Sequence, residues 1–313
     1  MITKKICFVQ FTHPGSEHGI DRGSANYKSW NYGEHKRKFL KATGSLFDKG
    51  KIESDQDLMF WGEWEPQSQV TRITNPHWSK DYPKYMHVPQ LDLSAPKFNT
   101  LGQPRQNTDP FVFADRFYYR CCKQQKFSSL KNLEKGSIIL FGSTINANKT
   151  SAYFAVDTVF VVGDYREYDS SAYKEQLEGF ISADYDEIVG IGLDRSDKNS
   201  EKACGEVEAS VSSFSAGAGY RCYSGATPND KVGNMYSFVP CKRYENGTIG
   251  FERLKVSESD FSSIKAWRNI LTNNLNAAPK ITELSIADNF KAWTILRDLT
   301  KAQGLLEGVS FKY

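Results

Sequence analysis

The side chains best suited to chemistry gather in one short segment of the chain. Residues 58–65 read Leu-Met-Phe-Trp-Gly-Glu-Trp-Glu, and a strand there would place Trp61, Glu63 and Glu65 on one face. Two carboxylates beside an indole ring suit hydrogen bonding to a base or sugar that stacks on the ring. A carboxylate pair also serves as general acid and base where neighbours separate the two pKa values. The alternative is a solvated strand face with Trp64 in the core.

A second chemically capable segment is residues 107–122, which hold two carboxylates, two guanidinium groups and five aromatic rings. An unpaired buried charge costs several kcal/mol, so these charges are either paired within the protein or directed at a ligand. As ligand contacts, Asp109, Arg116 and Tyr119 suit a nucleotide, because the guanidinium fork binds phosphate. The structural alternative is an Asx-type turn at Asp109 and pairing of Arg116 with Asp115.

Two histidines and a carboxylate follow the first apolar segment of the chain. His13, His18 and Asp21 lie in a loop rich in glycine and proline, where functional sites are common. Their spacing matches no standard zinc arrangement, so the histidines are interpreted as proton-transfer or structural groups. We therefore expect no bound metal and no cofactor.

Composition favours an ordinary globular protein. The chain has 313 residues, of which 39% are hydrophobic and 25% charged, and a net charge of +3. This small surplus permits a nucleic-acid partner without requiring one, because nucleic-acid binders carry a clustered basic patch. The six cysteines include no CxxC pair, and the beginning of the sequence holds neither a signal peptide nor a membrane span. We expect a cytoplasmic protein with no membrane association.

Several elements must position these residues. Apolar and β-branched runs predict a first strand over residues 4–12 and an antiparallel pair over 137–143 and 152–162. Ser285 and a regular apolar stripe predict a helix over residues 286–303, and another helix is expected near 260–272. The charged segment 35–41 is interpreted as the beginning of a short helix.

These elements predict an α+β fold. We expect a mixed or barrel-like β-sheet with C-terminal helices packed on it, in which residues 69–73 pair with the strand over 58–65. A single domain over residues 1–313 is expected, with a subdivision near residue 165 as the alternative.

Two resemblances to known groups of proteins supplement these patterns. The strings at 60–66 and 107–113 resemble a group of bacterial proteins to which no activity is assigned, so that resemblance implies no function. The strands over 135–141 and 154–162 are similar to small β-barrels of the PUA-like kind, including EVE and ASCH domains. This second resemblance implies a barrel that binds RNA or modified DNA bases.

Together these patterns predict a protein that binds a nucleic-acid base or a nucleotide, for example as a reader of modified bases. The alternative is a hydrolase of nucleotides or nucleic acid that uses Glu63 or Glu65 with His13 or His18. A docking role of the proline-punctuated loop over 74–110 is a third possibility. The ligand-binding residues predicted for the first function are Trp61, Glu63, Asp109, Arg116 and Tyr119.

Overall fold

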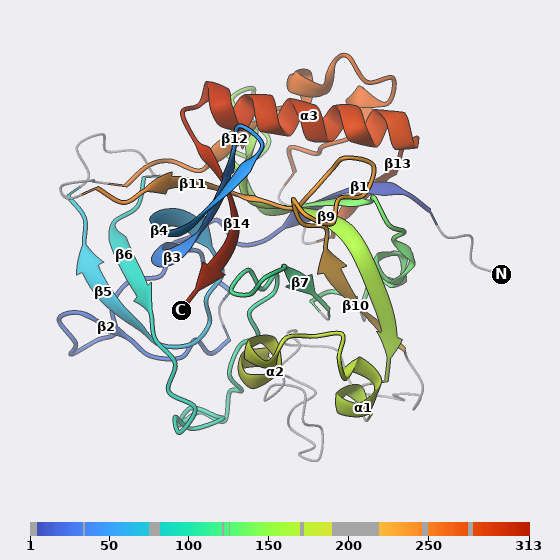
Figure 1. Ribbon diagram of the computed structural model, residues 1–313. Coiled ribbons are helices and arrows are strands. Elements are labelled where there is room, and N and C mark those ends of the chain that lie inside the picture. Colours follow the sequence, from blue (N-terminus) through green and yellow to red (C-terminus); the bar gives the residue numbers. More distant parts are fainter. Residues whose placement is uncertain are drawn as a thin grey trace.

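Strands form most of the described structure. The computed structural model describes residues 5–33, 35–74, 82–120, 122–124, 126–169, 172–189, 219–245, 250–274 and 278–313. These residues form two mixed seven-stranded sheets and three α-helices, so the fold is α+β (Figure 1). No helix in the described ranges is long and apolar enough to cross a membrane.

The first sheet has the strand order β13-β1-β8-β9-β10-β7, and β12 also pairs with β9. β1 runs parallel to β8, and the remaining pairs are antiparallel. The predicted pairing of 137–143 with 152–162 is confirmed, because β8 and β9 pair antiparallel. A polar turn joins the two strands. β9 continues as one strand across residue 165. The strands are β1 (Cys7–Thr12), β7 (Tyr118–Tyr119), β8 (Ile138–Ile145), β9 (Tyr153–Tyr168), β10 (Tyr220–Gly225), β12 (Leu254–Val256) and β13 (Lys280–Glu283).

The second sheet has the order β14-β11-β4-β3-β6-β5-β2. β14 pairs with both β11 and β3, so β3, β4, β11 and β14 form a closed ring of four strands. This ring is the barrel-like part of the fold. The strands are β2 (Tyr27–Lys28), β3 (Lys38–Asp48), β4 (Lys51–Gly62), β5 (Ser68–Arg72), β6 (Tyr85–Pro89), β11 (Val239–Arg243) and β14 (Leu306–Lys312).

Two expectations for this sheet are wrong. Residues 38–41 begin strand β3 and not a helix, because apolar side chains alternate inward along the strand. β4 pairs with β3 and β11, whereas β5 pairs with β6 and β2. The reason is the tight turn at Lys49 and Gly50, whose positive φ values of 47° and 82° join β3 to β4 as a hairpin.

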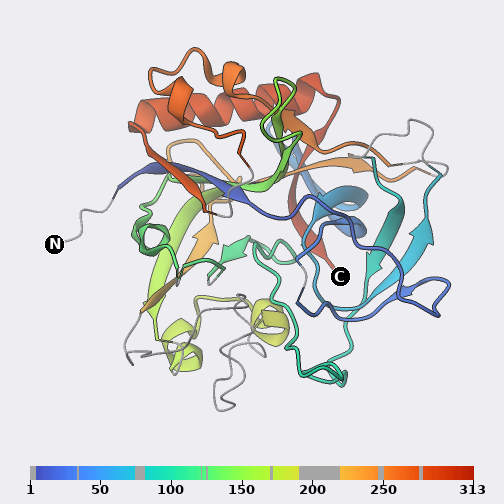
Figure 2. The same cartoon turned by 180° about the vertical axis from the view of Figure 1, so that it is seen from behind.

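The helices differ in length and position. α1 (Tyr173–Leu177) and α2 (Ala183–Val189) are short, whereas α3 (Ile286–Ala302) lies across the first sheet (Figures 1 and 2). The predicted start of α3 is confirmed, because the Ser285 hydroxyl accepts a hydrogen bond from the Asp288 backbone N–H. Trp293 and Leu296 anchor the helix in the core.

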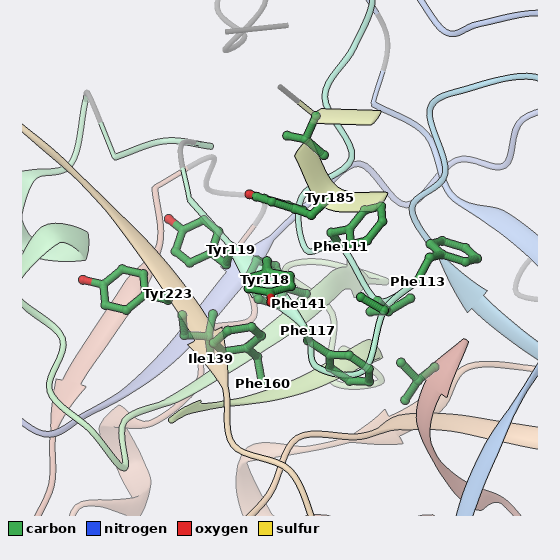
Figure 3. Close-up of a cluster of buried hydrophobic side chains, with 14 of the residues drawn as sticks. Phe111, Phe113, Phe117, Tyr118, Tyr119, Ile139, Phe141, Phe160, Tyr185 and Tyr223 are labelled. Atoms are coloured by element: carbon green, nitrogen blue, oxygen red, sulfur yellow. The ribbon is translucent and has the colours of Figure 1, made fainter. Parts of the chain in front are cut away.

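The aromatic run over 107–122 lies in the interior. Phe111, Phe113 and Phe117 pack with Tyr118 and Tyr119 in one hydrophobic cluster (Figure 3). Side chains from β8, β9 and α2 complete this cluster. The rings of this run therefore form core contacts between distant segments.

Candidate functional site

Seven ionisable side chains from both sheets meet in one buried group, which we call the ionic cluster. His13 follows β1, Asp157 lies on β9, and Arg253 precedes β12, while the others flank β3 and β4. Six of the seven side chains are at most 3% exposed, and the His35 side chain is 26% exposed. The members are His13, His35, Arg37, Glu63, Glu65, Asp157 and Arg253.

Glu63 is the centre of the cluster. Its Oε1 lies 3.3 Å from His35 Nδ1 and 3.5 Å from Arg37 Nη2. Its Oε2 faces the other side, 3.8 Å from His13 Nδ1. Two histidines therefore flank a single buried carboxylate.

Arg37 connects this carboxylate to Asp157, and a second arginine, Arg253, also contacts Asp157. Arg37 Nη1 lies 3.6 Å from Asp157 Oδ2, and Arg253 Nη1 lies 3.7 Å from Asp157 Oδ1. Arg253 also donates hydrogen bonds to Ser143 Oγ at 3.0 Å and to the Gly15 carbonyl at 3.3 Å. Arg253 is therefore fixed by neutral partners, whereas Arg37 is bounded mainly by carboxylates.

Glu65 is held by hydrogen bonds to residues outside the cluster. Asn31 Nδ2 donates a short hydrogen bond to Glu65 Oε2, and the Glu65 backbone N–H donates to Thr108 Oγ1 at 3.1 Å. Glu65 Oε1 points towards His35 Nδ1 at 3.7 Å. The asparagine therefore orients Glu65 and leaves one of its oxygens directed at the cluster.

Many polar atoms of the cluster lack a hydrogen-bond partner among the described residues. They include both ring nitrogens of His13, Nε and Nη2 of Arg37, and Oε2 of Glu63. Glu65 Oε1, both carboxylate oxygens of Asp157 and Arg253 Nε belong to the same group. Each unsatisfied buried group costs about 1–3 kcal/mol, and folded proteins leave few of them. Such a concentration marks the place where the protein can satisfy a polar ligand.

Burial and charge set the protonation of the two histidines in opposite directions. Burial and the nearby Arg37 guanidinium hold the pKa of His13 well below its ordinary value, so its imidazole is neutral. Burial also acts to lower the pKa of His35, but hydrogen bonds and charge from Glu63 and Glu65 outweigh it and raise the pKa to about 10. Burial raises the pKa of Asp157 against the opposing charges of Arg253 and Arg37.

Of the residues predicted from sequence, Glu63, Glu65 and His13 are brought together. Trp61 borders the cluster, since the Arg253 guanidinium lies 5.2 Å from its ring centroid. The Trp61 side chain is nevertheless in the core, and its indole N–H donates to the Phe251 carbonyl at 2.8 Å. Its ring therefore offers no open face to a base in this arrangement.

The remaining predicted residues lie elsewhere. The Asp109 carboxylate accepts hydrogen bonds from the backbone N–H groups of Arg120 and Cys122. Arg116 lies 3.8 Å from the exposed Asp230. Tyr119 is fully buried and its ring stacks with Tyr223 (Figure 3). These three residues do not converge on Glu63.

His18 is buried outside the cluster. Its backbone N–H donates to the Arg37 carbonyl, and its own carbonyl lies 3.3 Å from His87 Nε2. Together with Asp21, which pairs with Lys28 at 2.8 Å, His18 belongs to the loop scaffold beside β3.

Four cluster members were missed in the sequence: His35, Arg37, Asp157 and Arg253. The sequence indicated that Asp157 is unusual, because it is a single carboxylate within the apolar run 153–162. Arg37 gave no such signal, because it lies in a basic segment of the kind that usually forms a solvated face. The Arg37 side chain is nevertheless fully buried.

Comparison with known proteins gives no relative. No family model, no curated protein and no solved structure matches this chain significantly.

Proposed function

We propose that this protein is a hydrolase that acts on a nucleotide or on nucleic acid at the ionic cluster. The observation that carries the proposal is the pair formed by His13 and Glu63. His13 lies 3.8 Å from Glu63 Oε2, and neither of its ring nitrogens has a hydrogen-bond partner among the described residues. A neutral imidazole beside a carboxylate is the arrangement of a general base with its orienting group.

The residues take distinct roles in this proposal. His13 accepts a proton from water, and the water oxygen forms a bond to the phosphorus or sugar carbon under attack. The bond to the leaving group then breaks, and His13 returns the proton to that group. Glu63 orients His13 and stabilises its protonated form. The guanidinium nitrogens of Arg37 and Arg253 that lack a hydrogen bond among the described residues suit the oxygens of a phosphate.

Burial limits the size of the group that reaches the cluster. His35 is the cluster side chain most exposed to solvent, at 26%, so the approach runs past this residue. The deeper side chains are almost completely covered. These limits favour a group as small as a phosphate or the edge of a single base, and a paired duplex would require the base to leave the stack.

Base recognition without catalysis is the second candidate function. It is favoured by the mixture of donors on Arg37 and acceptors on Glu63 and Asp157 that lack a hydrogen-bond partner among the described residues. A base edge presents donors and acceptors together. A modified-base reader would bind such an edge at Glu63 and release it unchanged.

The experiment combines product analysis with binding. The wild-type protein is incubated with nucleoside mono-, di- and triphosphates and with short single-stranded oligonucleotides, and products are separated chromatographically. Turnover is expected, and His13→Gln and Glu63→Gln should each lower kcat by about 10²–10⁴-fold, the usual contribution of general acid–base catalysis.

The matched control is Glu307→Gln. Glu307 is also a buried carboxylate, but it pairs with Arg297 and Tyr236 beside α3. This variant should retain wild-type kcat. Binding of the same probes without turnover would favour the reader, and the absence of both binding and turnover would contradict both functions.

A further inference from the structure

Three side chains of the ionic cluster have the spacing of metal ligands. His35 Nδ1 and one carboxylate oxygen each from Glu63 and Glu65 all lie within 4.8 Å of one another. Within the described ranges, this is the group of histidine and carboxylate side chains with such spacing. It differs from the set His13, His18 and Asp21 considered from the sequence.

The distances within the group fit a small cation. His35 Nδ1 lies 3.3 Å from Glu63 Oε1 and 3.7 Å from Glu65 Oε1. Zinc binds nitrogen and oxygen at about 2.0–2.2 Å, which separates two tetrahedral ligands by about 3.4 Å. The side chains can therefore bind one ion between them with small adjustments, once the ion has displaced the proton that the two carboxylates hold on His35.

An outer hydrogen bond already orients Glu65, and an arginine lies beside Glu63. Asn31 donates to Glu65 Oε2 and leaves the buried Oε1 without a hydrogen bond among the described residues and directed at His35. Arg37 approaches Glu63 Oε1 at 3.5 Å as an ion pair without a hydrogen bond. Ligating carboxylates in metal sites are commonly held by a hydrogen-bonding neighbour, as Asn31 holds Glu65.

We propose that His35, Glu63 and Glu65 bind one divalent transition-metal ion of the Zn²⁺ or Mn²⁺ class. One imidazole and two carboxylates leave at least one position for water or substrate, as in catalytic rather than structural sites. The ligand types favour these ions over Mg²⁺, which prefers oxygen ligands in octahedral geometry. The proposal departs from the expectation of no metal drawn from the sequence.

The metal site deepens the proposed function but is tested independently of it. In a hydrolase, the ion would lower the pKa of a bound water that His13 then deprotonates. Metal binding without turnover would support the site and leave the hydrolase disproved. Turnover by metal-free protein that binds no metal would support the hydrolase and contradict the metal site.

The test measures metal affinity directly. Protein freed of metal with a chelator and dialysed is titrated with Zn²⁺, Mn²⁺ and Mg²⁺ by calorimetry and by competition with a chromophoric chelator. One Zn²⁺ or Mn²⁺ per chain is expected, with Mg²⁺ much weaker. Co²⁺ should give a visible absorption band typical of low coordination number.

Two variants and one control locate the ion. Glu65→Gln and His35→Gln should each weaken binding by at least about 100-fold, whereas Glu307→Gln should bind as the wild type does. His35→Gln carries the test if Glu65→Gln does not fold, because His35 lies at the exposed edge of the cluster. No stoichiometric binding by the folded wild type, or binding by both ligand variants as tight as that of the wild type, would overturn the proposal. His35 would then be a protonated imidazole that forms ion pairs with the two carboxylates.

Discussion

Trp61 is surrounded by hydrophobic side chains, with 4% of its surface exposed. Trp61→Ala should therefore lower the free energy of unfolding by about 3–5 kcal/mol, through lost burial and a cavity. Urea denaturation measures this loss. Leu101→Ala, at a position that is 81% exposed, should leave stability unchanged. An unaltered midpoint for Trp61→Ala would instead restore the interpretation of its ring as a stacking surface.

His18 makes the stability of the protein depend on pH. Burial lowers the pKa of His18 to about 2, whereas the unfolded chain has the ordinary value of about 6.5. On acidification the unfolded state binds a proton at His18 that the folded state does not bind. The contribution of His18 to the free energy of unfolding is therefore fully present above about pH 6.5 and is lost as the pH falls below this value. Between pH 7 and pH 5 this residue should contribute a loss of about 2 kcal/mol.

Urea denaturation of wild type and His18→Gln at pH 7 and pH 5 checks this dependence. The variant is expected to lose about 2 kcal/mol less over the interval, because glutamine does not titrate. An equal loss in both proteins would show that other groups carry the acid sensitivity. His87 is one such group, since burial holds its pKa well below the ordinary value as well.

Residue types alone could identify only part of the candidate site. Glu63, Glu65 and His13 stood out because carboxylates and histidines beside apolar runs are chemically unusual. Arg37 did not, because its neighbours His35, Lys36 and Lys38 resemble a solvated basic face. Whether a charge in a sequence is buried depends on tertiary partners, and burial is what gives this cluster its properties.

At the scale of elements, the closure between β3 and β14 depends on Gly44. A Cβ added at this residue would lie 2.4 Å from the Ser310 carbonyl oxygen, at the irregularity in the pairing of the two strands. Gly44→Ala should destabilise the protein by about 1–3 kcal/mol through overpacking. Thermal denaturation measures the effect, with Gly219→Ala as control because a Cβ there meets nothing within 4 Å. Equal melting temperatures for both variants would contradict the tight closure.

Local elements were predictable, and those defined by distant partners were not. The β8–β9 pair and the start of α3 depend on a turn and a cap that lie in the sequence beside them. The expected helix over 35–41 is wrong where β3 begins, at residues 38–41, because the basic residues there obscure the alternating apolar pattern of the strand. The expected helix near 260–272 forms the short 3₁₀ turns η4 (Glu258–Phe261) and η5 (Trp267–Asn269) instead.

At the scale of the whole molecule, the candidate site is a product of topology. Its members come from segments around residues 13, 35–37, 63–65, 157 and 253. No spacing rule links these positions, because strand pairing in two sheets brings them together. The α+β class with mixed sheets could be predicted from strand and helix patterns, whereas the ionic cluster required the pairing partners of β1, β4 and β9.

The closed ring also has a consequence for the order in which the chain becomes available for folding. β3 finds one of its two ring partners in the neighbouring β4 and the other in β14, near residue 310. A ribosome adds about 5–20 residues each second. The edge of β3 that pairs with β14 therefore lacks this partner for on the order of ten seconds or more during synthesis. Such an edge is a template for association with other chains. The exposed Asp55 and Asp57 and the half-exposed Glu53 lie on the adjoining half of β4, and charged side chains beside a free edge are a common means of limiting such association until β14 arrives.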